Sequence, residues 1–475
     1  MQCLTIRRDP QSVEPESLFC NQRMVSSPEE RPLRSLNNLF VACLAVMVVV
    51  PDGSALALLV FGLWGIYEAF KAGAHGVIAF WVADVRLRVL ALAVVGFVLG
   101  NAFLLAYHGA SSSDYEQLIP FILWPFASWL LVRQPVSSRL FFLGVAIAAL
   151  SSGLFALIQV LWFDMPHESR ASGWMANPIH FGHLCVLLAA YCLIGLLGSG
   201  GRVAGRNALL LGFCSALLGT ILSGSKSSWL AFGVFLLYLG LVGLRAKQLS
   251  RALVVKAAVV IAVLFWAFIA LSPSSQRLET FQTSVAALAA AVFDADKPLN
   301  LNEVSLDPSV NDRLAQYQMS AQLVAENPWF GISRPAINLE QEERVATAQP
   351  GFKRVYRHIH SEYLDTLVNR GLLGFLLLMF MFLALLWAVR RPLEPGPLSL
   401  GLPPSGPTES LTLAPSQPRL LGTCTLLLLA TMALFDILLS RVSVTALGLF
   451  VLAYCLATLY KPENAASALI PGKDS

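Results

Sequence analysis

Long apolar segments separated by polar connections dominate this sequence and limit what it can fold into. A membrane-spanning helix needs about 20 predominantly apolar residues, with a range of roughly 17 to 25. Of the 475 residues, 56% are hydrophobic and only 13% are charged, whereas a soluble domain has about 25% charged residues. We therefore expect an all-α polytopic membrane protein with about 12 transmembrane helices. The apolar segments lie near 36–50, 54–70, 88–107, 117–133, 139–162, 178–198, 207–222, 227–244, 252–272, 363–390, 419–439 and 444–460.

The distribution of Lys and Arg predicts how the chain is threaded, because cytoplasmic loops of membrane proteins carry an excess of both. With the N-terminus in the cytoplasm, 21 of the 33 basic residues fall on the cytoplasmic side and three fall in short outer loops. The other nine lie between 277 and 370, in a long outer loop and its exit. Both termini are therefore expected in the cytoplasm.

Two connections are much longer than the others. The outer one, nearly ninety residues long, is of the size and composition that usually forms a functional subdomain, and the inner one is rich in Pro and indicates a flexible linker. The predicted organisation is a disordered cytoplasmic tail at 1–35, helices 1–9 at 36–272, a periplasmic loop with catalytic elements at 273–361, helices 10–12 at 362–460 with the linker at 392–418, and a cytoplasmic tail at 461–475.

The long loop contains two stretches with helical periodicity. Apolar residues recur at helical spacing over 277–293, which predicts a helix lying on the membrane surface. A second helix is predicted from Asp312 to Glu326, with Asn311 as its N-cap. Asn327-Pro328 should end it.

Cations on the outer side are the most informative residues. Charged residues near membrane depth are costly and usually face a cavity or a partner. A group of them suits a lipid-anchored polyanion such as a diphosphate, because the guanidinium of Arg matches phosphate oxygens. The alternative is that each cation reaches lipid phosphate or pairs with an acid, as Asp436 could with Arg441. The cations at the outer ends of helices are Arg170, Lys226 and Arg441, and those from the long loop are Arg313, Lys353, Arg354 and Arg357.

His360 is the best candidate for a catalytic base. It precedes a predicted helix that Ser361 could cap, and the ordinary pKa of histidine, near 6.5, suits a general base at neutral pH. His358 lies two residues earlier and faces elsewhere if this stretch is extended.

Other chemistries have weak signals or none. The sequence has no P-loop, dinucleotide fingerprint, HExxH or GxSxG motif. Asp294 and Asp296 form a DxD pattern that we interpret as a solvated loop. His180 and His183 lie three residues apart with no acid or thiol as a third ligand, and no pair among the eight cysteines has metal-ligand spacing. We expect no metal, no cofactor and no nucleic-acid partner.

Four short motifs resemble those of the O-antigen ligases, within the wider superfamily of O-antigen ligases and polymerases. In HSEYLDTLVNRGLLG, Ser361 replaces the usual Asn of a His-Asn-x-x-Leu…Gly-x-x-Gly pattern. In DRLAQYQMSAQLVAENPWFGIS, Tyr317 takes the Trp position of an Arg-x-x-x-Trp…Pro-x-x-Gly pattern. RASGWMANPIHFG is similar to an Arg-x-x-Gly…Asn-Pro element, and SGSKSSWLAF places Lys226 where Arg is common.

The resemblance implies a GT-C-like glycosyltransferase that needs neither metal nor nucleotide sugar. Such an enzyme moves a finished glycan from undecaprenyl diphosphate to a sugar of the lipid A core, with inversion, at the periplasmic face of the bacterial inner membrane. Arg170, Lys226 and Arg313 would hold the diphosphate and stabilise its departing charge, with Arg441 as a weaker addition. His360 would deprotonate the acceptor hydroxyl. The expected partners are this donor, the lipid A-core acceptor and membrane lipids, and we expect a monomer.

Three other functions remain open at this stage. An O-antigen polymerase uses the same donor with a lipid-linked glycan as acceptor. A transporter or flippase for an anionic lipid would also need a cationic mouth, but its site should lie at the membrane midplane. A scaffold without catalytic activity gives no reason for the costly cations.

Overall fold

The computed structural model describes residues 39–44, 50, 52–162, 170–175, 177–198, 203–245, 308–347, 355–356, 358–390, 416–438 and 442–460. Every regular element within these ranges is a helix. Nine of the described helices are long and apolar enough to cross a membrane. The predicted fold class, an all-α polytopic membrane protein, is confirmed.

The helices follow the apolar segments of the sequence closely. Nine predicted segments coincide with the membrane-spanning candidates, and the segment at 419–439 becomes α15 (Ser416–Ala433). The candidates are α2 (Gly53–Ala72), α4 (Val85–Tyr107), the 3-10 helix η1 (Ser112–Leu118) joined to α5 (Ile119–Arg133), α6 (Ser138–Trp162), α7 (Pro178–Gly198), α8 (Val203–Ser223), α9 (Lys226–Arg245), α14 (Glu362–Arg390) and α16 (Val442–Leu459).

Some predictions lie wholly or partly outside the described residues. The first apolar segment is described as helix only at 39–44, and the ninth, 252–272, is not described. The same holds for both tails, the surface helix at 277–293 and the linker at 392–415.

Two short helices were not anticipated. α3 (Ala74–Ala83) follows Gly73, whose φ of 77° ends α2. Its ten residues are too few to span a bilayer, and its buried side chains Phe80 and Trp81 pack against Tyr460 and Trp124. The second is α13 (Arg334–Ala346), which begins after Ser333, whose hydroxyl accepts from Ala336 N.

The prediction for the helix at 312–326 is half right. α12 (Pro308–Glu326) ends where expected, before Asn327-Pro328. It begins at Pro308, however, so Asn311 lies inside the helix and the N-cap prediction is wrong. Proline is favoured in the first turn of a helix because its missing N–H would have no partner there.

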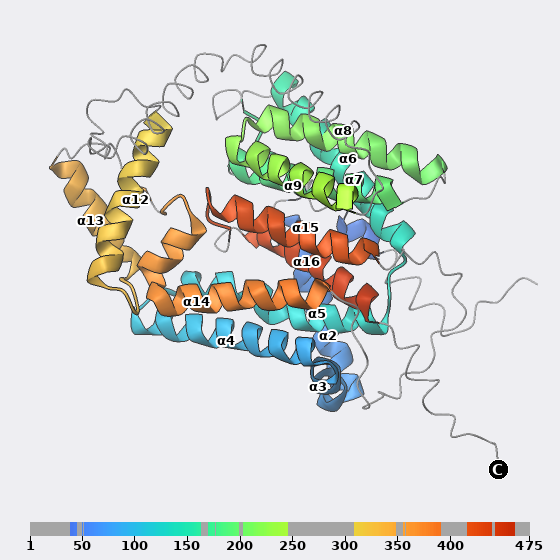
Figure 1. Ribbon diagram of the computed structural model, residues 1–475, viewed down its shortest axis with the longest axis horizontal. Helices are drawn as coiled ribbons and strands as arrows, with labels where there is room; N and C mark the ends of the chain where they lie inside the picture. Colours follow the sequence, from blue (N-terminus) through green and yellow to red (C-terminus); the bar gives the residue numbers. More distant parts are fainter. Residues whose placement is uncertain are drawn as a thin grey trace, which may run out of the picture.

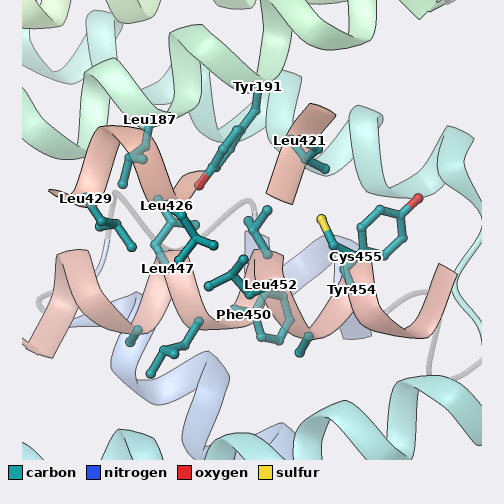
Figure 2. Close-up of a cluster of buried hydrophobic side chains, with 14 of the residues drawn as sticks. Leu187, Tyr191, Leu421, Leu426, Leu429, Leu447, Phe450, Leu452, Tyr454 and Cys455 are labelled. Atoms are coloured by element: carbon teal, nitrogen blue, oxygen red, sulfur yellow. The ribbon is translucent and has the colours of Figure 1, made fainter. Parts of the chain in front are cut away.

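The long helices run side by side, and α12 and α13 lie across one end of them (Figure 1). We call this the α12 end. α16 is at the centre and contacts α2, α5, α7, α14 and α15. Nearly all of its residues are buried, as expected for a helix that is apolar on every side. Figure 2 shows Leu187 and Tyr191 of α7 among leucines of α15 and α16.

A kink in α14 positions its first turns. Gly371 has φ 62° and ψ −167°, which interrupts the helix between two regular parts. The turn at 327–331 docks onto this interruption through backbone alone, with Leu372 N donating to Pro328 O at 2.7 Å and Ile332 N donating to Val368 O at 2.7 Å. A Cβ on Gly371 would lie 2.3 Å from the Trp329 carbonyl. The Pro-x-x-Gly and Gly-x-x-Gly motifs therefore pack against each other.

We expect Gly371→Ala to destabilise the protein more than Gly233→Ala in α9. The first change places a Cβ against backbone and in a left-handed conformation, which alone costs about 1–2 kcal/mol. A Cβ on Gly233 meets no atom within 4 Å, and alanine favours helix by about 0.5–1 kcal/mol over glycine. Thermal unfolding in detergent compares the two variants with wild type. Equal melting temperatures would contradict a tight contact at Gly371.

Candidate functional site

Two of the predicted cations lie at the turn between α8 and α9, one on it and one packed against it. Gly224, with φ 59°, makes the turn. Arg170 lies against it, and its Nε donates to Ser223 O at 2.9 Å. Lys226 is the first residue of α9 and is exposed. Because the N-terminus of a helix carries a partial positive charge, this turn concentrates positive potential at the α12 end.

The loop that carries Arg170 is fixed to α6 and α8. Gln159 Oε1 accepts from Ser172 N and Gly173 N, both at 3.0 Å, and Gln159 Nε2 donates to Gly173 O. Ala171 N donates to Leu222 O at 2.9 Å. The guanidinium of Arg170 therefore comes from a loop that hydrogen bonds hold to α6 and α8.

Serine hydroxyls join the α8–α9 turn to α7. Ser227 Oγ lies 3.0 Å from Nε2 of the buried His183, and Ser228 Oγ donates to Ser225 Oγ at 2.7 Å. A Cβ on Gly182 would lie 2.5 Å from the hydroxyl oxygen of Ser223. Glycine thus allows α7 to approach this turn closely.

Asp436, in the turn after α15, completes a buried polar cluster with the two histidines of α7. Its Oδ2 lies 3.0 Å from His180 Nε2 and 3.9 Å from His183 Nδ1. The expectation that no acid accompanies these histidines is therefore wrong, because the acid comes from a distant part of the chain. Among the described residues, no group of three or more His, Cys, Asp or Glu is arranged to hold a metal ion.

The cluster also fixes the start of α14. Burial alone raises the pKa of Asp436, but its hydrogen bond and electrostatic interaction with His180, with smaller contributions from His183 and Ile437 N, lower it to about 2. Asp436 is therefore ionised at neutral pH. Glu362 N donates to Asp436 O at 3.2 Å, and Leu438 N donates to Glu362 Oε2 at 2.8 Å. These two hydrogen bonds join the turn after α15 to the first turn of α14.

α12 fixes the backbone of His360 through two consecutive residues. Tyr317 OH donates to His360 O at 2.9 Å, and His360 N donates to Gln316 Oε1 at 3.3 Å. The imidazole packs against the edge of the Tyr356 ring, with 5.4 Å between centroids. Burial raises the pKa of Tyr317, so its hydroxyl remains a donor.

Arg313 lies one helical turn from Tyr317 on the same face of α12. It is half-buried and interacts electrostatically with Tyr317 and with His183. Arg313 is therefore close to both the histidine cluster of α7 and the segment that carries His360.

His358 contacts a different helix, as the extended reading predicted. Its Nδ1 accepts from Arg334 of α13, and Arg334 Nη2 lies 3.2 Å from Asp365 Oδ2. Because a guanidinium always donates, Nδ1 of His358 carries no proton in this arrangement. Asp365 Oδ1 in turn accepts from Ile359 N at 3.2 Å.

The structure thus brings four predicted site residues, Arg170, Lys226, Arg313 and His360, to the α12 end. Arg441 lies outside the described residues, as do Lys353, Arg354, Arg357, Asp294 and Asp296. Sequence reasoning missed the positions of Gln316, His180 and His183 in this site. It named Asp436 only as a partner for Arg441.

Residues 209–379 match the family model of the O-antigen ligases. This segment is similar to an O-antigen ligase domain. The match includes Lys226, Arg313, His360 and Gly371, and supports a function of the O-antigen ligase or polymerase type in lipopolysaccharide biosynthesis. No match is found among curated proteins. With its apolar helices, the chain is a multi-pass membrane protein.

We expect His180→Ala to lower the free energy of unfolding by about 3 kcal/mol, because removing one partner leaves the buried Asp436 charge poorly paired. His183 Nδ1 lies 3.9 Å from Asp436 Oδ2, so it offsets the loss of the His180 imidazole only in part. His108→Ala is the control, since His108 is half-buried and bonds a single carbonyl, Phe330 O. Unfolding in detergent measures both variants, and an equal or larger loss in His108→Ala would contradict the ion pair.

Proposed function

We propose that this protein is an inverting, metal-independent O-antigen ligase of the bacterial inner membrane. It transfers a glycan from undecaprenyl diphosphate to a hydroxyl of the lipid A-core oligosaccharide, with the α12 end facing the periplasm and both termini in the cytoplasm. The observation that supports this most is the arrangement at the α12 end, where the α8–α9 turn, the buried Asp436 cluster and the His360 segment are linked by hydrogen bonds.

The cations would bind and stabilise the leaving diphosphate. Arg170 supplies forked donors and Lys226 a compact charge, and the N-terminus of α9 begins at Lys226 itself. Helix N-termini with nearby cations favour phosphate. Arg313 adds charge from α12. As the bond to the sugar breaks, negative charge grows on the diphosphate, and donors held in place beforehand stabilise it without reorganising.

His360 would act as the general base. It accepts the proton of the acceptor hydroxyl as the oxygen attacks the anomeric carbon on the face opposite the diphosphate, which inverts that carbon. A positioned base contributes roughly 10²- to 10⁴-fold. No energy source is needed, since the donor already carries an activated leaving group and positioning can supply much of the remaining acceleration.

In a strain that lacks this gene, we expect bare lipid A-core and accumulated lipid-linked glycan on a lipopolysaccharide gel. Wild type should restore the ladder, and His360→Ala should not, because the hydroxyl would lack its base. His108→Ala is the matched control and should restore the ladder. Protein levels in the membrane are compared by immunoblot.

Other outcomes would point to a different enzyme or residue. Core capped with single repeat units in the deletion strain identifies a polymerase. A full ladder with His360→Ala, at normal protein level, overturns the catalytic assignment and leaves the ligase function standing.

We expect Tyr317→Phe to lower kcat about fivefold with little change in KM for the donor. The hydroxyl bonds only the backbone of His360, and one such bond contributes about 1 kcal/mol. Tyr67→Phe, on the exposed side of α2, is the control. Transfer from a purified lipid-linked glycan to lipid A-core, measured with detergent-solubilised protein, separates kcat from KM. A raised KM with unchanged kcat would mean that Tyr317 binds donor instead.

A further inference from the structure

The helix α13 has no part in the proposed chemistry, yet it contacts the segment that carries His360 at two points. It lies beside α12, at the end of the molecule where that segment enters α14 (Figure 1). The side-chain oxygen of the buried Gln341 accepts from Tyr356 N at 2.7 Å. Arg334, at the N-terminal end of α13, donates to Nδ1 of His358.

Arg334 connects the histidine segment to α14. One guanidinium nitrogen, Nη1, donates to His358, and the other, Nη2, lies 3.2 Å from Asp365 Oδ2. Asp365 is buried in the first turn of α14. Because a guanidinium is planar and its donors form a rigid fork, the two contacts together fix His358 relative to the start of this helix.

Asp365 uses its second oxygen on the same segment. Its Oδ1 accepts from Ile359 N at 3.2 Å, and the side chain of Ile359 is fully buried. An ion pair that only joined α13 to α14 would need neither this bond nor the one to His358. Here each member of the pair also bonds one of the two residues directly before His360.

We propose that Arg334 is a positioning residue for His360. It holds His358 directly and Ile359 through Asp365, so that the imidazole of His360 meets the acceptor hydroxyl at the required distance. The proposal rests on the proposed function, because it takes His360 as the general base. Such a base must lie within about 2.6–3.2 Å of the atom that loses the proton, and a misplacement of about 1 Å can lower a rate about 100-fold.

Direct binding of the diphosphate by Arg334 is the main alternative, because a guanidinium suits phosphate wherever it is accessible. Two nitrogens of Arg334 already have protein partners, which favours the positioning role. The two roles differ in their kinetic effect. Loss of a phosphate contact raises KM for the donor, whereas loss of positioning lowers kcat.

The first experiment compares two arginines of α13. We expect Arg334→Gln to lower kcat about tenfold, a part of what a misplacement of about 1 Å can cost, with KM for the donor unchanged. Arg344→Gln is the matched control, because Arg344 bonds Glu340 of α13 and Gln322 of α12, and it should match wild type. Melting temperatures in detergent show that each variant is folded at the assay temperature. A raised KM with unchanged kcat in Arg334→Gln would overturn the proposal.

His358 provides a second test that leaves α13 and its ion pair intact. Asparagine carries an oxygen on the same Cγ that carries Nδ1 in histidine, so His358→Asn keeps an acceptor for Arg334. We expect this variant to retain most of the wild-type kcat. His358→Ala removes the acceptor and should lower kcat about fivefold, the effect of losing one hydrogen bond. An equal loss in both variants would overturn the proposal.

The third experiment detects the position of His360 without any transfer. The seven histidines are labelled with ¹³C at Cε1, and the NMR signal of His360 is the one lost in His360→Ala. This ring packs against the edge of the Tyr356 ring, whose ring current shifts the signal. We expect Arg334→Gln to move or broaden the signal and Arg344→Gln to leave it unchanged. A signal that is the same in both variants would overturn the proposal.

Failure of the proposed function gives a different pattern from failure of the positioning role. If the His360 signal depends on Arg334 but wild type transfers no glycan to lipid A-core, Arg334 positions the segment and the ligase function falls. If wild type transfers glycan while Arg334→Gln matches Arg344→Gln in kcat and in the His360 signal, the ligase function stands and the positioning role is wrong.

Discussion

The backbone contact between the turn at 327–331 and the interruption of α14 at Gly371 is the interaction on which the α12 end depends. It uses main-chain donors and acceptors, and it requires glycine at 331 and 371 because a Cβ on either would overlap the partner backbone. The contact anchors α12 and α13 to a membrane-spanning helix. It also separates the first turns of α14 from the rest of that helix, so that Glu362 can meet Asp436 while the remainder follows the bundle.

The second constraint is the ionised Asp436 in a buried position. Desolvating a carboxylate is costly, and the cost is offset only by well-placed partners. Here the carboxylate contacts His180 and His183 of α7 and accepts from Ile437 N in its own turn. The backbone carbonyl of Asp436 accepts from Glu362 N of α14, so three elements meet at this residue. A buried polar network with so many members permits one arrangement of these elements. Lys226 is joined to this network through its neighbour Ser227, which contacts His183, and His360 lies just before α14, so the network helps to preorganise these two residues.

More of the fold than of the candidate site could be predicted from the sequence. Apolar runs of about 20 residues determine helices whatever their neighbours, which is why the long helices lie where expected. α3 was missed because ten apolar residues in a loop resemble a connection, and the start of α12 because Pro308 precedes a polar turn. The motif residues were recognisable one by one. Their pairing was not, because the contacts of Asp436 with His180, and of Gly331 with Gly371, join distant parts of the chain and leave no local periodicity.

The three departures from the family pattern become physically distinct once they are placed. Tyr317 supplies a hydroxyl that reaches the His360 carbonyl, a contact that the ring N–H of a tryptophan would have to make from a different position. Lys226 stands at the N-terminus of α9, where its own charge is unfavourable against the helix dipole. Under the proposed function, the bound diphosphate offsets the charge of Lys226 and that of the helix N-terminus. The exchange of Arg for Lys keeps the attraction and gives up the forked geometry, which Arg170, packed against this turn, retains. Ser361, where Asn is usual, is buried directly before α14, and its carbonyl accepts from Asp365 N. This bond is the ordinary first backbone hydrogen bond of a helix, so the exchange of Asn for Ser leaves the start of α14 intact.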